Sequence, residues 1–547
     1  MKEAYIFFRK YYKKDFRVYM YIFFSFAVKV CALAIPYLTK ILIDQIEYKN
    51  IENFKFTSFI LVLTMVVFSI FLSSRYYLQN YIEVKILNEL KKEMLTKILR
   101  VKTEKLKSIS VGELMQKIFN DTEVVRPLVI SVFVDCTLNI MYSFSIIIIM
   151  FTMNKVLTLI LIALMPIFIY FYKVYVPKIE KVNSKIITSE EDIKSLSEEI
   201  LNGSLDIKIN NANEFIEYKI SNKFIRYFDL VLNKIKYIIQ YDYILVTGIM
   251  NFSTLLIYCF GGYLVFKNII SIGTLISFTL YFSRLWDPVE YFMELSKEVK
   301  IQLLSLKRIE EYLKFQEEDL MESDKLPEFK ELKIENLSFN YGERVIFENL
   351  NFEIKSGETI GIKGSNGAGK STLANIITKL ISEYNGNIYY NGLNYKLLNP
   401  RRVREKIIFI PSKTFLFSGS ITENITLKAN SKENMVTGLV EKWEITELIG
   451  ALVSNNRTLK TRVNNQSNNL SGGEQKIIQI LRGIFLEGDV YILDEPFNYV
   501  DKKHKQILIE LIKEKLKFKT VIIISHDEEI FQCCKKVYKL EKNLNEI

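Results

Sequence analysis

Six long apolar stretches in the first three-fifths of the chain constrain its fold more than any other feature. Each is close to or above the ~20 residues that a helix needs to cross a bilayer. The stretches lie near residues 18–43, 57–79, 128–152, 155–176, 243–266 and 273–293. A soluble protein would spread such apolar content along the chain. The pattern therefore predicts an all-α transmembrane domain of six helices over residues 1–308 and makes the lipid bilayer a partner.

The positive charge of the chain follows the same pattern. The net charge is +11, which would suit nucleic acid, but the Lys and Arg residues gather between the apolar stretches. The segments 80–127 and 177–242 are long, basic and helical in period, whereas the links at 154–155 and 267–271 are short. Basic segments between spans stay in the cytoplasm. We therefore predict a multi-pass protein of the cell membrane, with the C-terminal half cytoplasmic and no nucleic acid as partner.

A cleaved signal peptide is the alternative interpretation of the first stretch. Ala32-Leu33-Ala34 has the form of a cleavage site. Against this, the apolar run continues past that site, and Lys29 would interrupt an ordinary signal core. We expect a membrane span here.

The pattern changes after Arg308. Residues 309–330 form a charged segment, which we interpret as a linker. From residue 331 to 547 short β-rich runs alternate with helical segments and glycine turns. This alternation predicts an α/β nucleotide-binding domain of the P-loop type.

A glycine-rich run in this second half carries the first chemical signal. It fits G-x-x-x-x-G-K-[ST], follows a predicted strand and opens a predicted helix. Backbone N–H groups in such a loop surround phosphates at a helix N-terminus. Lys370 would neutralise the β- and γ-phosphates of ATP, and Ser371 would ligate Mg²⁺. The predicted ATP-binding residues of this run are Gly364, Ser365, Asn366, Gly367, Ala368, Gly369, Lys370, Ser371 and Thr372.

Two adjacent carboxylates end a second apolar run, Val490–Leu493. Asp494 is predicted to support the Mg²⁺ ion, and Glu495 to polarise the water that attacks the γ-phosphate. Such a strand end alone is weak evidence, but downstream of a P-loop it indicates ATP hydrolysis.

The segment Leu470-Ser471-Gly472-Gly473-Glu474-Gln475 resembles the signature motif of the ATP-binding cassette (ABC) family. The resemblance implies that Ser471, Gly472 and Gly473 face the γ-phosphate of the nucleotide held by a partner's P-loop. The chain would then be a half-transporter that works as a homodimer or a heterodimer.

Further family landmarks follow in order. Tyr341 is similar to the aromatic residue that stacks on adenine, Asp501 to a residue of the dimer-contact loop, and His526 to the switch histidine near the γ-phosphate. His504, among lysines, is expected to be a solvated surface residue. The first half resembles the exporter branch of the family, with Gly112-Glu113-Leu114 similar to its first coupling region.

The chain departs from the family at three positions. Ser412 stands where a glutamine normally ligates Mg²⁺, and Asn465 and Ser467 replace a Glu and a Gly before the signature. Serine is shorter and would reach the ion through a water. Ser412 is kept as a candidate nucleotide and metal ligand, and looser coupling to the membrane domain is expected.

Lys29 and Asp135 are ionisable groups inside apolar stretches, where such groups usually have a function. Two interpretations are open: they line a substrate cavity, or they pair with each other.

The combined prediction is an ATP hydrolase coupled to transport, with ATP and Mg²⁺ as cofactors. It would export a peptide, a lipid or an amphipathic small molecule. The alternatives are a regulatory or channel-like ATP-binding subunit with weak hydrolysis, or one half of a heterodimeric exporter. The sequence identifies neither the substrate nor the second subunit.

Overall fold

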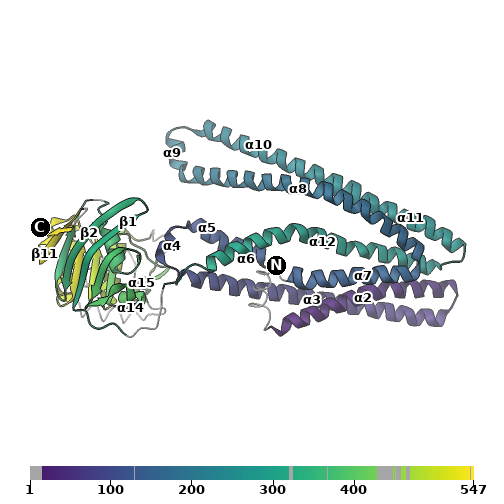
Figure 1. Cartoon of the computed structure of the whole chain (residues 1–547), viewed down its shortest axis with the longest axis horizontal. Helices are drawn as coiled ribbons and strands as arrows, with labels where there is room; N and C mark the ends of the chain where they lie inside the picture. The colour runs from purple at the N-terminus through teal and green to yellow at the C-terminus, as the bar shows by residue number, and fades with distance from the viewer. Residues whose placement is uncertain are drawn as a thin grey trace. The chain divides into compact units, whose positions relative to one another are not determined.

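The computed structural model describes residues 15–128, 130–318, 325–365, 367–427, 448, 450, 452, 458–463, 469–541 and 544–546. The chain forms two compact units (Figure 1). The helical unit comprises Met1–Glu93 and Met115–Glu311, and the cassette unit comprises Met94–Leu114 and Tyr312–Ile547. The boundaries predicted from the sequence, at 308 and 330, stay predictions.

The helical unit is built from long helices with short connections. They begin at side-chain caps where the sequence offers one: the side chain of Asp15 accepts from Arg17 N at 3.0 Å, and that of Asn154 from Leu157 N at 2.9 Å. The main helices are α2 (Phe16–Glu47), α3 (Ile51–Ile98), α7 (Cys136–Met153), α8 (Lys155–Asn202), α10 (Asn213–Ile238), α11 (Thr247–Phe266) and α12 (Ile272–Leu313). Shorter helical segments join them: α6 (Thr122–Val125) and α9 (Ser204–Ile209), with π-helical turns at Gln116–Asp121, Ile130–Asp135 and Ile239–Val246. Helix α4 (Thr103–Lys107) belongs to the cassette unit, and α5 (Val111–Met115) spans the division between the units.

Five helical segments in the described residues are long and apolar enough to cross a membrane, one fewer than predicted. They are Phe16–Glu47, Ile51–Ile98, Val111–Met153, Lys155–Asn202 and Asn213–Phe266. The sixth predicted stretch lies in α12, whose apolar half carries Arg284, Asp287 and Glu290. These charges lower its hydropathy, so the sixth span stays a prediction.

A small apolar core holds these helices together. Tyr142, Ile146, Ile257 and Phe278 are all buried in it, and Ala32 packs into the same cluster at 4% exposure. Helix α2 therefore continues without a break through the segment that has the form of a signal-peptide cleavage site. A second buried cluster lies around Phe168, Val176 and Tyr241. In the most apolar part of α3, by contrast, only 6% of residues are buried. A surface of this kind is suited to lipid.

The cassette unit contains two sheets of different kinds. The four-stranded sheet is antiparallel in the order β2-β1-β4-β5, and the six-stranded sheet has the order β12-β11-β3-β10-β9-β6 with only β12 antiparallel. Their strands are β1 (Glu331–Tyr341), β2 (Arg344–Lys355), β3 (Thr359–Lys363), β4 (Asn385–Tyr390), β5 (Leu393–Asn394), β6 (Ile407–Ile410), β9 (Val490–Asp494), β10 (Thr520–Ile524), β11 (Lys536–Leu540) and β12 (Leu544–Glu546). A short ribbon pairs β7 (Gly419–Ser420) with β8 (Arg462–Val463).

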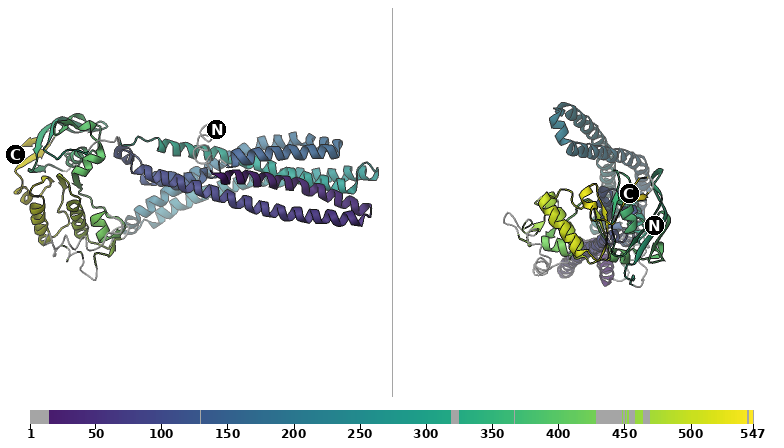
Figure 2. Two further views of the ribbon diagram at one scale, coloured as in Figure 1. Left: turned by 90° about the horizontal axis from the view of Figure 1, so that it is seen from below. Right: turned by 90° about the vertical axis from the view of Figure 1, so that its left-hand side faces the viewer.

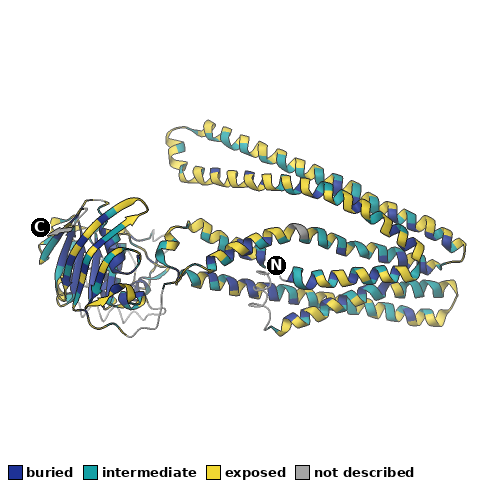
Figure 3. Ribbon diagram, in the orientation of Figure 1, coloured by how far each residue is buried: buried dark blue, intermediate teal, exposed yellow. Residues whose placement is uncertain are grey.

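The central position of β9 and β10 in the parallel sheet explains why their sequences are apolar. Every residue of β9 and β10 is buried (Figure 3), as expected for strands covered on both faces. The helices of this unit are α13 (Lys370–Ile377), α14 (Pro400–Lys406), α15 (Ile421–Thr426), α18 (Gly472–Phe485), α19 (Lys502–Lys515) and α20 (Glu528–Phe531), with a 3₁₀ turn at Tyr395–Leu397. Because β3, β10 and β9 are parallel neighbours, the segments that follow them meet at one edge of the sheet.

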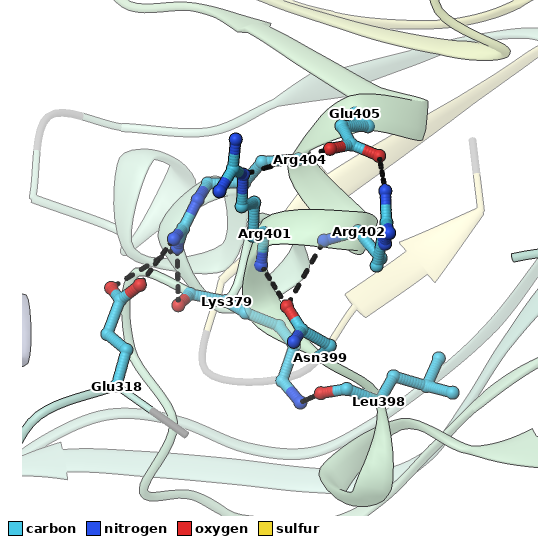
Figure 4. A network of polar contacts seen from close by, with 8 residues as sticks. All are labelled: Glu318, Lys379, Leu398, Asn399, Arg401, Arg402, Arg404 and Glu405. Carbon is cyan, nitrogen blue, oxygen red and sulfur yellow. Dashed lines mark hydrogen bonds and ion pairs between the residues drawn. The ribbon is translucent and has the colours of Figure 1, made fainter. Parts of the chain in front are cut away.

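Part of the predicted linker is bound within the cassette unit. Glu317 forms an ion pair with Lys97 at 2.6 Å, and Glu318 forms one with Arg404 of α14. The side chain of Asn399 caps α14 by accepting from the backbone N–H of Arg401 at 2.8 Å. Figure 4 shows that Arg404 also donates to the backbone carbonyl of Lys379, two residues after α13 ends. Glu317 and Glu318 of the predicted linker are thus held by ion pairs.

Candidate functional site

The P-loop lies between β3 and α13, where its glycines are sterically required. Gly367 and Gly369 have φ of +83° and +92°, a left-handed region that favours glycine. A Cβ on Gly369 would lie 2.4 Å from Ile346 Cγ2, and one on Gly364 would lie 2.6 Å from the carbonyl oxygen of Leu540. Ala368 N donates to Ser365 O at 3.2 Å and Thr372 lies in α13, whereas Asn366 is outside the described residues.

Lys370 closes this loop. Its ammonium donates to the carbonyl oxygens of Gly364 at 2.7 Å and Ser365 at 3.1 Å, and the residue is only 8% exposed. Burial lowers the pKa of Lys370, while the negative charges of Glu495 and Asp494 raise it. A cation held across the loop is in place to neutralise phosphate oxygens.

Ser371 and Asp494 form the part of the site that fits Mg²⁺. The Ser371 hydroxyl donates to Asp494 Oδ2 at 2.7 Å, and Asp494, at the end of β9, is 3% exposed. A hydroxyl and a carboxylate are hard oxygen donors of the kind that Mg²⁺ prefers. The described residues hold no group of three or more His, Cys, Asp or Glu residues suited to a metal ion.

Glu495 and His526 meet above the P-loop lysine. His526 Nε2 lies 3.3 Å from Glu495 Oε1 and 3.3 Å from Lys370 Nζ. Glu495 has φ of +46°, a conformation that is uncommon for a residue with a side chain, and its backbone N donates to Ile524 O at 2.8 Å. Within the described part of the chain, Glu495 Oε1 is buried and makes no hydrogen bond, although His526 Nε2 lies within ion-pair distance of it. A buried carboxylate oxygen without a hydrogen bond is available to a water or a ligand.

Tyr341 lies at the end of β1 and is half exposed. Its ring contacts Phe339 edge-on with centroids 4.8 Å apart. The adjoining cavity of about 690 Å³ is lined by Tyr341, by the segment 380–385 and by residues of α4. An exposed ring beside a cavity is a suitable surface for stacking a base.

The signature residues lie on α18. Ser471 caps this helix with a capping box: Ser471 Oγ accepts from Glu474 N at 3.2 Å, and Ser471 N donates to Glu474 Oε2 at 2.6 Å. Gly472 and Gly473 let the loop after β9 approach the start of α18, because a Cβ on Gly473 would lie 2.8 Å from Tyr499 O. Helix α18 packs at β6, which β9 and β10 separate from β3. At ~4.8 Å per strand, β6 lies roughly 14 Å from the P-loop strand.

Asp501 caps helix α19, and its predicted place in a dimer-contact loop stays a prediction. Its side chain caps α19 by accepting from the backbone N–H groups of Lys503 and His504, both at 3.1 Å. The His504 ring also bonds to Asp501, which lowers the pKa of Asp501. His504 was predicted to be a solvated surface residue, but its side chain is only 22% exposed and is bound to the carboxylate. The prediction failed because the sequence does not show that a cap three residues earlier would bind it.

Sequence reasoning missed Lys476, the fifth residue of α18. Lys476 is 1% exposed, and its ammonium donates to the carbonyl oxygens of Pro411 at 2.9 Å and Ser412 at 3.2 Å. Burial lowers the pKa of Lys476 to about 8, although Asp494 and Glu495 raise it. The available signal was a lysine directly before the apolar residues Ile477 and Ile478 of an amphipathic helix after the signature. Ser412 itself is exposed, and Asn465 and Ser467 lie outside the described residues.

The intramembrane charges do not pair with each other. Lys29 donates to Asn139 Oδ1 at 2.8 Å, whereas Asp135 accepts from the Tyr21 hydroxyl at 2.7 Å and from Arg75 at 3.1 Å. The interpretation that Lys29 and Asp135 pair is therefore wrong, because each has a nearer partner. Their place in a substrate cavity stays a prediction.

The fold and the site together define a P-loop nucleotide-binding cassette fused to a helical membrane domain. Residues 18–289 match the family model described as ABC transporter transmembrane region, and residues 347–498 match the one described as ABC transporter. The chain belongs to the ABC transporter family. It is a multi-pass membrane protein with an ATP-binding domain, and it is a half-transporter of the exporter type.

Similar proteins agree with this assignment. A putative multidrug export ATP-binding/permease protein of Bacillus subtilis is 22% identical over 90% of this chain and 87% of its own length. A lactococcin-G-processing and transport ATP-binding protein of Lactococcus lactis is 24% identical over 71% of this chain and 55% of its own. The solved structure of a bacterial Atm1-family ABC exporter with ATP bound has the same fold, with a TM-score of 0.81, 17% identity, and coverage of 97% of this chain and 94% of that one.

Proposed function

We propose that the chain hydrolyses ATP to drive export of a peptide, a lipid or an amphipathic small molecule out of the cytoplasm. One observation carries this proposal: in a cassette fused to membrane helices, His526 Nε2 lies 3.3 Å from both Lys370 Nζ and Glu495 Oε1. Named functions of the similar proteins, multidrug export and lactococcin transport, support export but do not select one substrate.

Each residue of the site has a proposed role in hydrolysis. Glu495 accepts the proton of the attacking water through its carboxylate, and His526, whose Nε2 lies 3.3 Å from Glu495 Oε1, positions that carboxylate and the γ-phosphate. Lys370 neutralises phosphate oxygens, and Tyr341 stacks on the adenine. Ser371 and Asp494 would hold Mg²⁺, with Ser412 reaching it only through water. When bound, the ion would neutralise the charge that develops on the phosphates.

The site is proposed to be completed by a second subunit. Ser471 lies on a helix that packs at β6, which two strands separate from the P-loop strand β3, so we propose that it faces a partner's nucleotide rather than its own. The hairpin α8–α10 points to the same conclusion. Figure 2 shows these two helices alongside each other, and none of the residues of α9 or α10 is buried. We propose that a partner subunit, identical or different, contacts both Ser471 and the hairpin α8–α10. The cassettes would lie in the cytoplasm and the helices in the cell membrane.

Substrate-stimulated ATP turnover by the purified chain in liposomes tests this function. An exporter hydrolyses ATP faster when a transported peptide or amphipathic compound is present, and it accumulates that compound inside inverted vesicles. Turnover that ignores every compound tried, together with ATP-gated leakage, would favour the channel-like alternative that Ser412 suggests.

A further inference from the structure

The loop that follows β6, residues 411–415 and here called the β6 loop, is bound along its length to α18. Its first two carbonyl oxygens, those of Pro411 and Ser412, both accept from the ammonium of Lys476. This is the loop in which Ser412 replaces the expected glutamine. The Ser412 side chain is exposed, so the loop contributes its backbone rather than that side chain to the contact.

Two further side chains of α18 continue the contact. Gln479 Nε2 donates to Lys413 O at 3.2 Å, and Arg482 Nη1 donates to Phe415 O at 3.0 Å. Lys476, Gln479 and Arg482 follow one another at intervals of three residues, so they lie on one face of the helix. Three side chains on one face of α18 therefore donate to four of the five carbonyl groups of the β6 loop.

Lys476 is the most constrained of the three. It is 1% exposed, and a buried ammonium is stable only when hydrogen-bonded or near opposite charge. Both conditions hold, because two carbonyl oxygens accept from it and the charges of Asp494 and Glu495 act on it. The same helix begins at Ser471, which caps its first turn.

We propose that Lys476 is a positioning residue that fixes the β6 loop to α18, so that loop and helix move as one body when a partner's nucleotide engages Ser471. The proposal rests on the proposed function, and it names a connection to the β6 loop that does not need the missing glutamine. Movement of the loop would then follow the partner's nucleotide at Ser471 rather than this chain's own Mg²⁺.

Tryptic cleavage after Lys413 in the full-length protein tests the connection without requiring activity. Lys413 is exposed, and a released loop is cut far faster than a held one. Lys476→Met keeps a side chain of similar length but removes the hydrogen-bond donor. We expect it to raise the rate of cleavage at Lys413 by at least about tenfold, which corresponds to the lower end of the free energy of a hydrogen bond from a charged donor. Lys476→Arg should stay close to the unmodified protein. Lys513→Met, at an exposed lysine of α19, is the matched control and should change nothing.

A second readout separates positioning from simple loss of structure. In Lys476→Met we expect kcat for ATP to fall about tenfold while KM stays within about twofold, and Lys476→Arg should recover most of kcat. Lys476→Gln, which keeps one donor, should give intermediate values if the Met variant folds poorly. Unchanged cleavage at Lys413 in both neutral variants, or cleavage that rises while kcat does not fall, would overturn the proposal. Absent turnover in the unmodified protein would instead count against the proposed function, and cleavage at Lys413 would still decide whether Lys476 holds the loop.

Discussion

Replacing Lys476 by Met should remove a pH dependence of stability from the cassette. Burial lowers the pKa of Lys476 from 10.5 to about 8. Because the pKa in the folded chain lies below that in the unfolded chain, the unfolded chain binds more protons between these two values. The free energy of unfolding must then rise with pH across the window from about 8 to 10.5.

The size of this effect follows from the shift. One pKa unit is worth about 1.4 kcal/mol, so raising the pH from ~7.5 to ~9.5 should add ~2 kcal/mol through Lys476. In a domain of this size, ~2 kcal/mol corresponds to roughly 4–8 °C in the unfolding temperature. The pKa of Lys370 is also lowered, but this group is present in both proteins and cancels from the difference.

The assay is thermal unfolding of the unmodified and Lys476→Met proteins in detergent, without nucleotide or Mg²⁺, at these two pH values. We expect the unmodified protein to gain several degrees relative to the variant at the higher pH. Equal pH responses in the two proteins would refute the reasoning, because they would mean that the Lys476 ammonium is not desolvated.

Three further predictions concern the P-loop, the β6 loop and the membrane charges. Gly369→Ala should weaken ATP binding by about tenfold or more, since a left-handed Ala costs ~1–2 kcal/mol and its Cβ would meet Ile346; Gly392→Ala, left-handed but in open space, is the control, and equal ATP affinity in both variants would contradict this view. Ser412→Gln should sharpen the Mg²⁺ dependence of ATP turnover and raise its response to substrate; identical Mg²⁺ titrations would make Ser412 a neutral departure. Arg75→Met should destabilise the helical unit by about 2–3 kcal/mol, less than the ~3–5 of a fully buried pair because 25% of the Arg75 side chain is exposed. Lys300→Met, in an exposed pair, should cost under ~1 kcal/mol, and similar unfolding temperatures for these two variants would show that Asp135 does not need Arg75.

The local motifs of the cassette were predictable because each depends on residues close in sequence. The glycines of the P-loop, the buried strand before Asp494 and the Ser471 cap are fixed by backbone sterics and by hydrophobic burial. The family assignment and the two-part fold predicted from them are confirmed by the family matches. The roles of the individual site residues remain predictions.

Contacts between distant segments were not predictable. Lys29 was weighed against Asp135, but its partner is Asn139, and which helices pack together decides that choice. The sequence shows Lys476 only as one polar residue of an amphipathic helix, and its carbonyl partners lie 64 and 65 positions earlier in the chain. The sixth span was expected from apolar length, although the charges in α12 reduce its hydropathy.

The most direct test of the central claim is ATP turnover by Glu495→Gln. If Glu495 accepts the proton of the attacking water, the variant should bind ATP normally and hydrolyse it roughly 10²–10⁴-fold more slowly. In the isolated cassette, saturating ATP should also trap the slow variant as a closed dimer, seen by light scattering. The control Glu529→Gln changes an exposed carboxylate of α20 and should leave turnover unaltered. Near-normal turnover by Glu495→Gln would contradict the account and remove this residue from the chemistry.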